Sequence, residues 1–397
     1  MTLVDLDVLK ARVCRQVDEV AELLVDVAHQ IHEHPELGYR EHFAHDLLTS
    51  VLETEDVEVE RGAYALPTAF VARSGVEGPE VAICCEYDAL PGLGHACGHN
   101  VIAAAGLGAG LALASVAADA GGRVRVLGTP AEEGGAGKVL MAERGAFDGV
   151  AAAMMVHPAG ADLSVMDVIA ASLMEVEYHG KAAHAAAFPH LGRNALDAAV
   201  LGYVNVAALR QHIEGTERVH GVFTSGGDKA NIVPDHTAMD WMVRSAQAAS
   251  LAPLRERVVA CLEAGAAAAG CRIEHRIVSR DYADMIDNPV LVDLYSTNSA
   301  ALGRRLATAT EAGTRVVGST DMGNVSYLVP SIHPMIKVAP AGVSIHSVAF
   351  AGHARSPEAD RAVLDGAKAM AMTVVDLWSR PAALADVQAT FAPPIRN

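Results

Sequence analysis

Hydrophobic and polar residues follow helical spacing near the start of the chain. Over residues 9–31, apolar side chains recur every three or four positions, which predicts an amphipathic helix. Pro35 disfavours helical backbone geometry at His34, so this helix is expected to end just before His34. Residues 41–52 have similar spacing and predict a second helix.

Strand-like apolar runs follow at residues 68–72, 80–84 and 123–128. Between the last two lies the apolar stretch 101–118, whose Ala- and Gly-rich composition predicts a buried helix and would insert poorly into lipid. Strand–helix–strand order predicts a parallel sheet. The polar motifs then fall where strands end, which is the edge where open α/β sheets place their functional sites.

The pattern changes near residue 170. Alternating or apolar runs at 173–180, 218–224, 237–244 and 271–278 predict strands, and 195–211 and 251–269 predict helices. This order predicts an inserted α+β domain of the ferredoxin-like type. The expected fold is therefore α/β, with a mixed, largely parallel sheet sandwiched by helices. Its first part spans residues 1–170, the inserted domain 171–284, and its second part 285–397.

Composition narrows the classes of function. Hydrophobic residues make up 51% of the 397 residues, which excludes a disordered chain and allows two separate cores. A net charge of -18 argues against nucleic acid or an anionic membrane surface as partner.

Cysteine usage and the N-terminus bear on location. The six cysteines show no regular spacing, so no disulfide framework is expected, and Cys84 and Cys85 in an apolar run predict buried strand thiols. The N-terminal segment is acidic and lacks the basic start and apolar core of a signal peptide. These features predict a cytoplasmic protein.

The chemistry is concentrated in three short segments. Residues 94–100 read GHACGHN, and Cys97 and His99 within them can face one ion from an extended loop. The adjacent acids Glu132 and Glu133 lie in a turn rich in Pro and Gly, and such neighbours repel each other unless a cation lies nearby. His157 ends an apolar run. Together they predict a metal-activated hydrolase.

These motifs identify a resemblance. The chain resembles the co-catalytic metallohydrolases that include aminoacylases, carboxypeptidases and dipeptidases, and is most similar to their amidohydrolase branch. The segments that show this resemblance are the HACGH motif, 86–92 (EYDALPG), 180–185 (GKAAHA) and 319–326 (STDMGNVS). They are similar to p-aminobenzoyl-glutamate hydrolase subunits and β-alanyl-lysine-type dipeptidases.

The resemblance implies a site with two divalent ions, either zinc or manganese. Cys97 would bridge the ions, His99 and Glu133 would hold one, and His157 with a C-terminal histidine the other. Glu132 would be the general base that takes a proton from the attacking water and returns it to the leaving nitrogen.

Two points remain open under this resemblance. The wider family has His-x-Asp where this chain has Glu86-Tyr87-Asp88, so Asp88 either orients the site or is a buried structural residue. The C-terminal ligand is His346 or His353, and the spacing to the following helix favours His346. His333 is interpreted as structural.

The resemblance also assigns roles within the inserted domain, which would act as a lid and as the contact of a homodimer. His184 would stabilise the oxyanion, while Asn231 and Arg244 would bind the substrate carbonyl and carboxylate. The N-terminal residues His32, His34, Glu36 and Glu41 are expected to be structural.

The predicted activity is hydrolysis of a linear amide bond in a small molecule with a free carboxylate: an N-acyl amino acid, a p-aminobenzoyl-glutamate-like compound or a dipeptide. Two alternatives stay open, a broad N-acyl amino acid aminoacylase and a non-catalytic partner subunit of a hetero-oligomeric hydrolase. The ligand set with Glu132 argues against the silent subunit.

Overall fold

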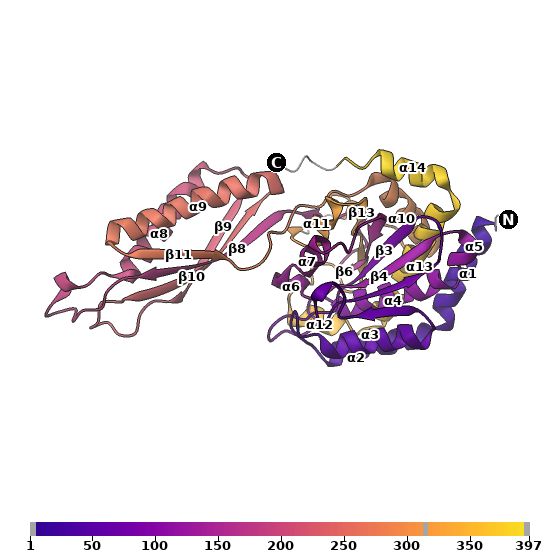
Figure 1. The fold of residues 1–397 in the computed structure, drawn as a ribbon, viewed down its shortest axis with the longest axis horizontal. Coiled ribbons are helices and arrows are strands. Elements are labelled where there is room, and N and C mark those ends of the chain that lie inside the picture. Colours follow the sequence, from indigo (N-terminus) through magenta and orange to yellow (C-terminus); the bar gives the residue numbers. More distant parts are fainter. Residues whose placement is uncertain (1–4, 313–316, 393–397) are drawn as a thin grey trace. The chain divides into compact units, whose positions relative to one another are not determined.

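The computed structural model describes residues 5–312 and 317–392, and the chain divides into two compact units. Unit 1 combines the residues up to Asp167 with those from Met285 onward, and unit 2 is Val168–Asp284. Figure 1 labels many of the helices and strands of both.

Unit 1 is built on a six-stranded sheet with the order β1-β2-β4-β3-β5-β13. The strands are β1 (Glu58–Arg61), β2 (Phe70–Ser74), β4 (Arg123–Gly128), β3 (Glu80–Cys85), β5 (Val150–Met154) and β13 (Ser331–Ile332). Strands β4, β3, β5 and β13 run parallel, whereas β2 is antiparallel to β4 and to β1. The predicted mixed, largely parallel sheet is confirmed. Short strands β6 (His157–Ala159) and β14 (Met335–Lys337) pair in parallel beside it.

Helices cover both faces of this sheet. Alternate side chains of β3 enter two different cores, with Ile83 in the larger and Cys84 in the smaller. The larger core is formed with α1 (Leu6–Glu19), α2 (Ala21–Glu33), α3 (His42–Thr54), α4 (His99–Ala114), α5 (Ala117–Ala120), α10 (Pro289–Ala301), α12 (Val348–His353), α13 (Pro357–Ser379) and α14 (Pro381–Ala389). The smaller core includes α7 (Gly137–Glu143) and α11 (Met322–Ser326). Burial on both faces explains why these strands are apolar throughout.

Two helices differ from the expected ranges. The single helix expected over 9–31 is two helices, α1 and α2, which meet at Val20 with ψ 15°. The sequence has neither Gly nor Pro there, so its apolar spacing continues through the break. The apolar stretch 101–118 is also divided, into α4 and α5. Nearly every residue of α4 is buried, as predicted, and none of the helices described is long and apolar enough to cross a bilayer.

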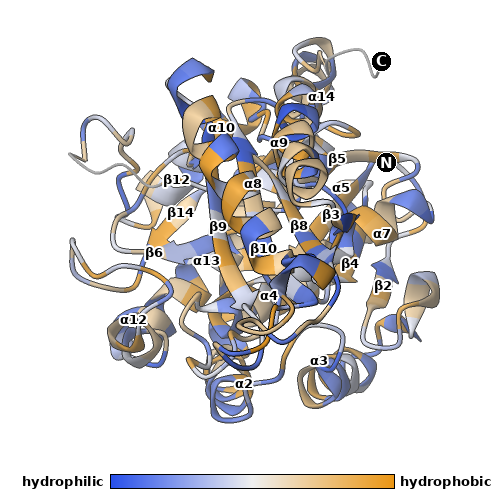
Figure 2. Cartoon of the chain, turned by 90° about the vertical axis from the view of Figure 1, so that its left-hand side faces the viewer, coloured by the Kyte–Doolittle hydropathy of each residue, from blue (hydrophilic) through white to orange (hydrophobic). Residues whose placement is uncertain are grey.

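Unit 2 is a four-stranded antiparallel sheet with the order β11-β8-β10-β9. Its elements are β8 (Ala170–His179), α8 (Ala195–Leu209), β9 (Arg218–Ser225), β10 (His236–Ser245), α9 (Ala248–Ala269) and β11 (Arg272–Ile277). This is the ferredoxin-like order predicted from the sequence. Side chains such as Tyr178 and Trp241 pack under α8 and α9, whereas Glu177 and Asp240 alternate with them on the other face. Figure 2 shows the hydrophobic segments along α8.

Candidate metal centre and active site

The candidate site is assembled from the carboxyl ends of neighbouring parallel strands in unit 1. Glu86 and Asp88 follow β3, Glu132 and Glu133 follow β4, and His157 comes shortly after β5. Because these strands are parallel, their ends meet at one edge of the sheet. The long loop after β3 returns to this edge, where α4 begins at His99.

A glycine allows the loop to approach the strand after β5. Gly98 has a positive φ of 80°, and a Cβ built there would lie 2.5 Å from the ring of Pro158. Any larger residue would therefore push the loop away from Pro158, which follows His157. This close approach lets Cys97 Sγ lie 3.4 Å from His157 Nε2.

Two groups of potential metal ligands share Cys97. The first is Cys97, His99 and His157, all buried, and the second is Cys97, Glu133 and His346. Within each group the ligand atoms lie within 4.8 Å of one another. The resemblance implied a different grouping, with His99 beside Glu133 and His157 beside His346, whereas distance places Glu133 with His346. The reason is geometric, since the Glu133 carboxylate turns to His346, with Oε1 3.0 Å from Nε2.

The donor set fits divalent metal ions. Thiolate and imidazole groups suit zinc and similar ions. Glu86 is fully buried, and its Oε2 atom lies 3.4 Å from His99 Nε2 with no hydrogen-bond partner among the described residues. A buried, unpaired carboxylate oxygen is costly, so a cation nearby would stabilise this arrangement.

Asp88 positions residues of both groups. Its Oδ1 atom lies 3.0 Å from His99 Nδ1, which leaves His99 Nε2 directed toward the site. Its Oδ2 atom accepts a 2.9 Å hydrogen bond from the backbone amide of Glu133. A carboxylate that orients a histidine in this way is typical of metal sites.

The C-terminal histidines occupy different places. His346 has a left-handed backbone with φ 62° and its amide donates to the Ala96 carbonyl at 2.8 Å, next to Cys97. His353 ends α12 and joins neither ligand group within the residues that the structure describes.

His333 lies beside the site, which the sequence interpretation missed. Its ring is buried, with its centroid 5.3 Å from that of His157, and neither ring nitrogen has a hydrogen-bond partner in the described part of the chain. Burial lowers the pKa of His333 to about 4. The sequence contains a signal for this contact, since a His-Pro pair occurs both at 157–158 and at 333–334. The two pairs lie next to each other, and the His157 amide donates a hydrogen bond to the Pro334 carbonyl.

A second feature missed from the sequence is a buried charge network. Lys138 Nζ lies 2.5 Å from Glu86 Oε1 and 2.7 Å from Asp321 Oδ1, and all three side chains are fully buried. Burial alone would lower the Lys138 pKa, but Asp321 and Glu86 raise it well above its usual value. Lys138 therefore stays charged and compensates the carboxylates around it.

Glu132 lies inside this electrostatic environment. Its Oε2 atom is 3.9 Å from His99 Nε2, and its side chain is only 9% exposed. Burial raises its pKa well above the usual carboxylate range, and the nearby charges of Glu86 and Glu133 raise it further.

The remaining predicted site residues lie in unit 2. His184 is exposed, and its Nδ1 atom accepts hydrogen bonds from the amides of Ala186 and Ala187 at 3.3 and 3.1 Å. The Asn231 carbonyl accepts a 3.1 Å hydrogen bond from the Ala185 amide, so the loops bearing His184 and Asn231 are neighbours. Arg244 is half-buried on β10, where burial lowers its pKa.

Sequence comparisons relate nearly the whole chain to known hydrolases. The family described as Peptidase family M20/M25/M40 matches residues 82–374. The Xaa-Arg dipeptidase of Mus musculus is 40% identical over 98% of this chain and 93% of its own length. A p-aminobenzoyl-glutamate hydrolase component of Escherichia coli is 28% identical over 89% of this chain and 88% of its own.

Solved structures support the same fold. An aminobenzoyl-glutamate utilization protein from Klebsiella pneumoniae aligns with a TM-score of 0.74 at 21% identity, covering 92% of this chain and 98% of that one. A dinuclear metal binding peptidase of family M20 from Bacillus subtilis aligns with a TM-score of 0.69 at 22% identity, covering 91% and 99%. The predicted resemblance is thereby confirmed: this chain belongs to peptidase family M20/M25/M40 and is a metal-dependent hydrolase of peptide or amide bonds.

Proposed function

We propose that this protein is a two-metal dipeptidase that removes a cationic C-terminal residue such as Arg or Lys. The observation that carries the proposal is the pair of ligand groups that share Cys97, with Glu132 buried beside them. The relative named Xaa-Arg dipeptidase supports this substrate class. A net charge of -18 supports it as well, because a negative protein attracts cationic substrates and repels glutamate-containing ones.

The proposed cofactor is a pair of divalent ions, with zinc favoured over manganese by the soft ligand Cys97. Cys97, His99 and His157 would hold one ion, and Cys97, Glu133 and His346 the other. Such ions, when bound, activate a water and polarise the carbonyl that it attacks.

The protein's own groups would handle protons and orientation. Glu132 would accept a proton from the attacking water and deliver it to the leaving nitrogen. Asp88 holds the His99 ring and the Glu133 backbone, which fixes ligands on both sides of Cys97. His184 would donate to the oxyanion, Asn231 would bind the substrate carbonyl, and Arg244 would bind the terminal carboxylate.

A homodimer formed through unit 2 belongs to the same proposal. Along α8 the side chains of Val200, Leu201 and Val204 are 44%, 41% and 56% exposed, and β9 forms an edge of the sheet. An apolar helix face beside an open strand edge is a suitable surface for a second copy. Light scattering measures the oligomeric state, and a monomer at all concentrations would contradict the proposed dimer.

Six free cysteines fit the proposed cytoplasmic location.

The test is hydrolysis by the purified protein after chelation and after return of zinc or manganese. We expect metal-restored turnover of β-alanyl-lysine and Xaa-Arg dipeptides, with weaker turnover of N-acetyl amino acids and p-aminobenzoyl-glutamate. Glu132→Gln should lower kcat by about 10³-fold while two ions remain bound, because the lost group transfers protons. Preferred turnover of p-aminobenzoyl-glutamate would overturn the substrate class, and an active Glu132→Gln would overturn the mechanism.

A further inference from the structure

A second cluster of potential metal ligands lies in unit 2 and shares no residue with the ligand groups proposed above. His179 is the last residue of β8 and His236 the first of β10, and the two are directly opposed across the antiparallel pair. Their ring centroids are 5.4 Å apart. Glu177, two residues before His179, places its Oε2 atom 2.9 Å from His236 Nε2 and 3.9 Å from His179 Nε2.

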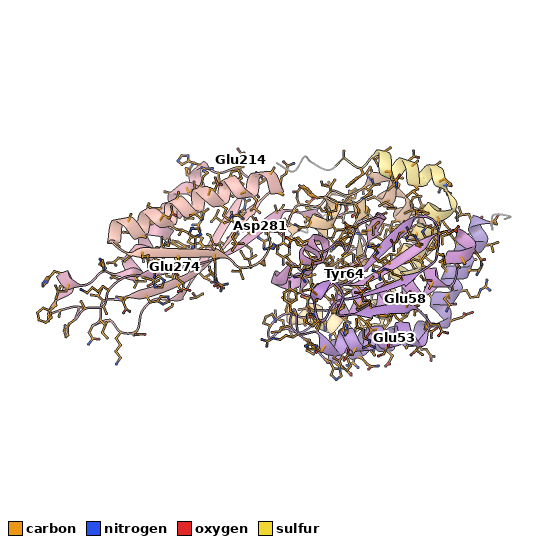
Figure 3. All side chains as sticks on the ribbon, viewed as in Figure 1. Glu53, Glu58, Tyr64, Glu214, Glu274 and Asp281 are labelled. Atoms are coloured by element: carbon orange, nitrogen blue, oxygen red, sulfur yellow. The ribbon has the colours of Figure 1, made fainter. Side chains whose placement is uncertain are left out.

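A fourth side chain approaches from the neighbouring strand on the other side. Glu274 on β11, labelled in Figure 3, pairs with Glu177 in register, and its Oε2 atom is 3.7 Å from His179 Nε2. The cluster therefore joins three adjacent strands on the face of the sheet opposite the helices.

An ordinary His–Glu ion pair explains only part of this geometry. It accounts for the 2.9 Å contact of His236 with Glu177. It leaves His179 Nε2 shielded from solvent and without a hydrogen-bond partner in the described ranges, although two carboxylates lie just beyond hydrogen-bond distance.

The spacing instead suits an ion between the side chains. One ligand atom each from His179, His236 and Glu177 lies within 4.8 Å of the others. Tetrahedral bonds of about 2.0–2.1 Å place ligand atoms roughly 3.3–3.5 Å apart, so small side-chain rotations are sufficient. Imidazole with carboxylate is a donor set for zinc and its neighbours, whereas magnesium prefers oxygen alone. Arg272 is already paired with Glu274, which limits its repulsion of a cation.

The position of the cluster gives it a role. The chain leaves β8 at His179 and runs directly into the loop with His184, while the loop with Asn231 leads directly into His236. The two loops meet at their base, where the Gly180 amide donates to the Asp235 carbonyl at 2.7 Å.

We propose that His179, His236 and Glu177 form an accessory site for a zinc-like divalent cation, which ties β8 to β10 and orders the loops bearing His184 and Asn231. Glu274 supplies a fourth ligand from β11. The effect on catalysis rests on the roles proposed above for His184 and Asn231, but the binding of the ion does not.

The test counts zinc ions per chain by mass spectrometry after chelation and stepwise return of zinc. The wild type is compared with His179→Gln/His236→Gln and with the single variant His236→Gln. The matched control is His275→Gln, an exposed histidine on β11 that belongs to no potential ligand group of the described residues. We expect the wild type and the control to bind one more ion than the double variant. His236→Gln should weaken that ion by at least about 10-fold.

A second readout follows the loops without any substrate. Trypsin cleavage at Lys181 and Lys229, which lie in the two loops, should become several-fold slower with zinc in the wild type and remain unchanged in the double variant. Equal zinc stoichiometry in the wild type and in a folded double variant would overturn the site. Binding without protection of either lysine would overturn its role in ordering the loops. Neither result depends on turnover, so failure of the proposed activity is a separate outcome.

Discussion

The two units carry clusters of the same residue types in opposite environments. In unit 1, the His99, Glu86 and Lys138 side chains are fully buried. In unit 2, the His179, His236 and Glu177 side chains are 29%, 44% and 46% exposed. Both clusters contain histidine beside carboxylate at similar distances, so burial is their main difference.

This difference decides what each cluster needs. A charge removed from water must be compensated, because its desolvation costs several kcal/mol even after relaxation. Unit 1 meets this requirement with Lys138 and, in our proposal, with two ions. In unit 2 the charged groups remain partly hydrated, so their desolvation costs little. A cation there is therefore optional for stability and is suited to regulation.

The largest expected effect comes from Cys97→Ala, because Cys97 belongs to both ligand groups. We expect loss of both ions and a fall in turnover of about 10³-fold or more, since the activated water is lost with them. Metal content and kcat measure this. Cys84→Ala is the matched control, because Cys84 is a buried thiol of β3 outside the ligand groups of the described chain. A Cys97→Ala protein that keeps two ions would contradict the shared-ligand arrangement.

A somewhat smaller effect is expected for Lys138→Met. The variant leaves Glu86 and Asp321 buried without their cation, so the free energy of unfolding should fall by about 3–5 kcal/mol. Urea unfolding measures it. The matched control is Arg12→Met, whose partner Asp119 is 49% exposed and whose ion pair contributes about 1 kcal/mol at most. Equal losses in the two variants would remove burial as the explanation.

The smallest effect of the three concerns Asp287, a carboxyl group of unit 1 that lacks a compensating cation among the described residues. Burial raises its pKa to about 7 from 3.8, although the His333 backbone amide opposes the shift. When folding raises the pKa of a carboxyl group, the folded protein loses stability as the pH rises from the unfolded pKa to the folded one, here from 3.8 to about 7. Asp287→Asn should therefore be more stable than the wild type at pH 8 by on the order of 2 kcal/mol, and no more stable near pH 4. Urea unfolding at both pH values checks it, and a pH-independent difference would show that Asp287 does not titrate this way.

Local pattern was enough to predict most elements. Strand β4 coincides with the expected residues 123–128, and the six elements of unit 2 follow the expected order. These predictions succeeded because alternation and helical spacing reflect which face of a single element is buried. The break at Val20 was missed because it has no local marker and depends on how α1 and α2 pack.

Sequence alone determined the family, the ferredoxin-like order of unit 2 and the types of ligand available, because these depend on short motifs and on periodicity along the chain. Only the tertiary structure decided which ligands group around Cys97, that His333 lies against His157, and that Lys138 lies between Glu86 and Asp321. It also brought His179 and His236 face to face across β8 and β10. The physical reason is that contacts between residues far apart in the chain depend on sheet order and loop closure, which no local pattern of side chains encodes.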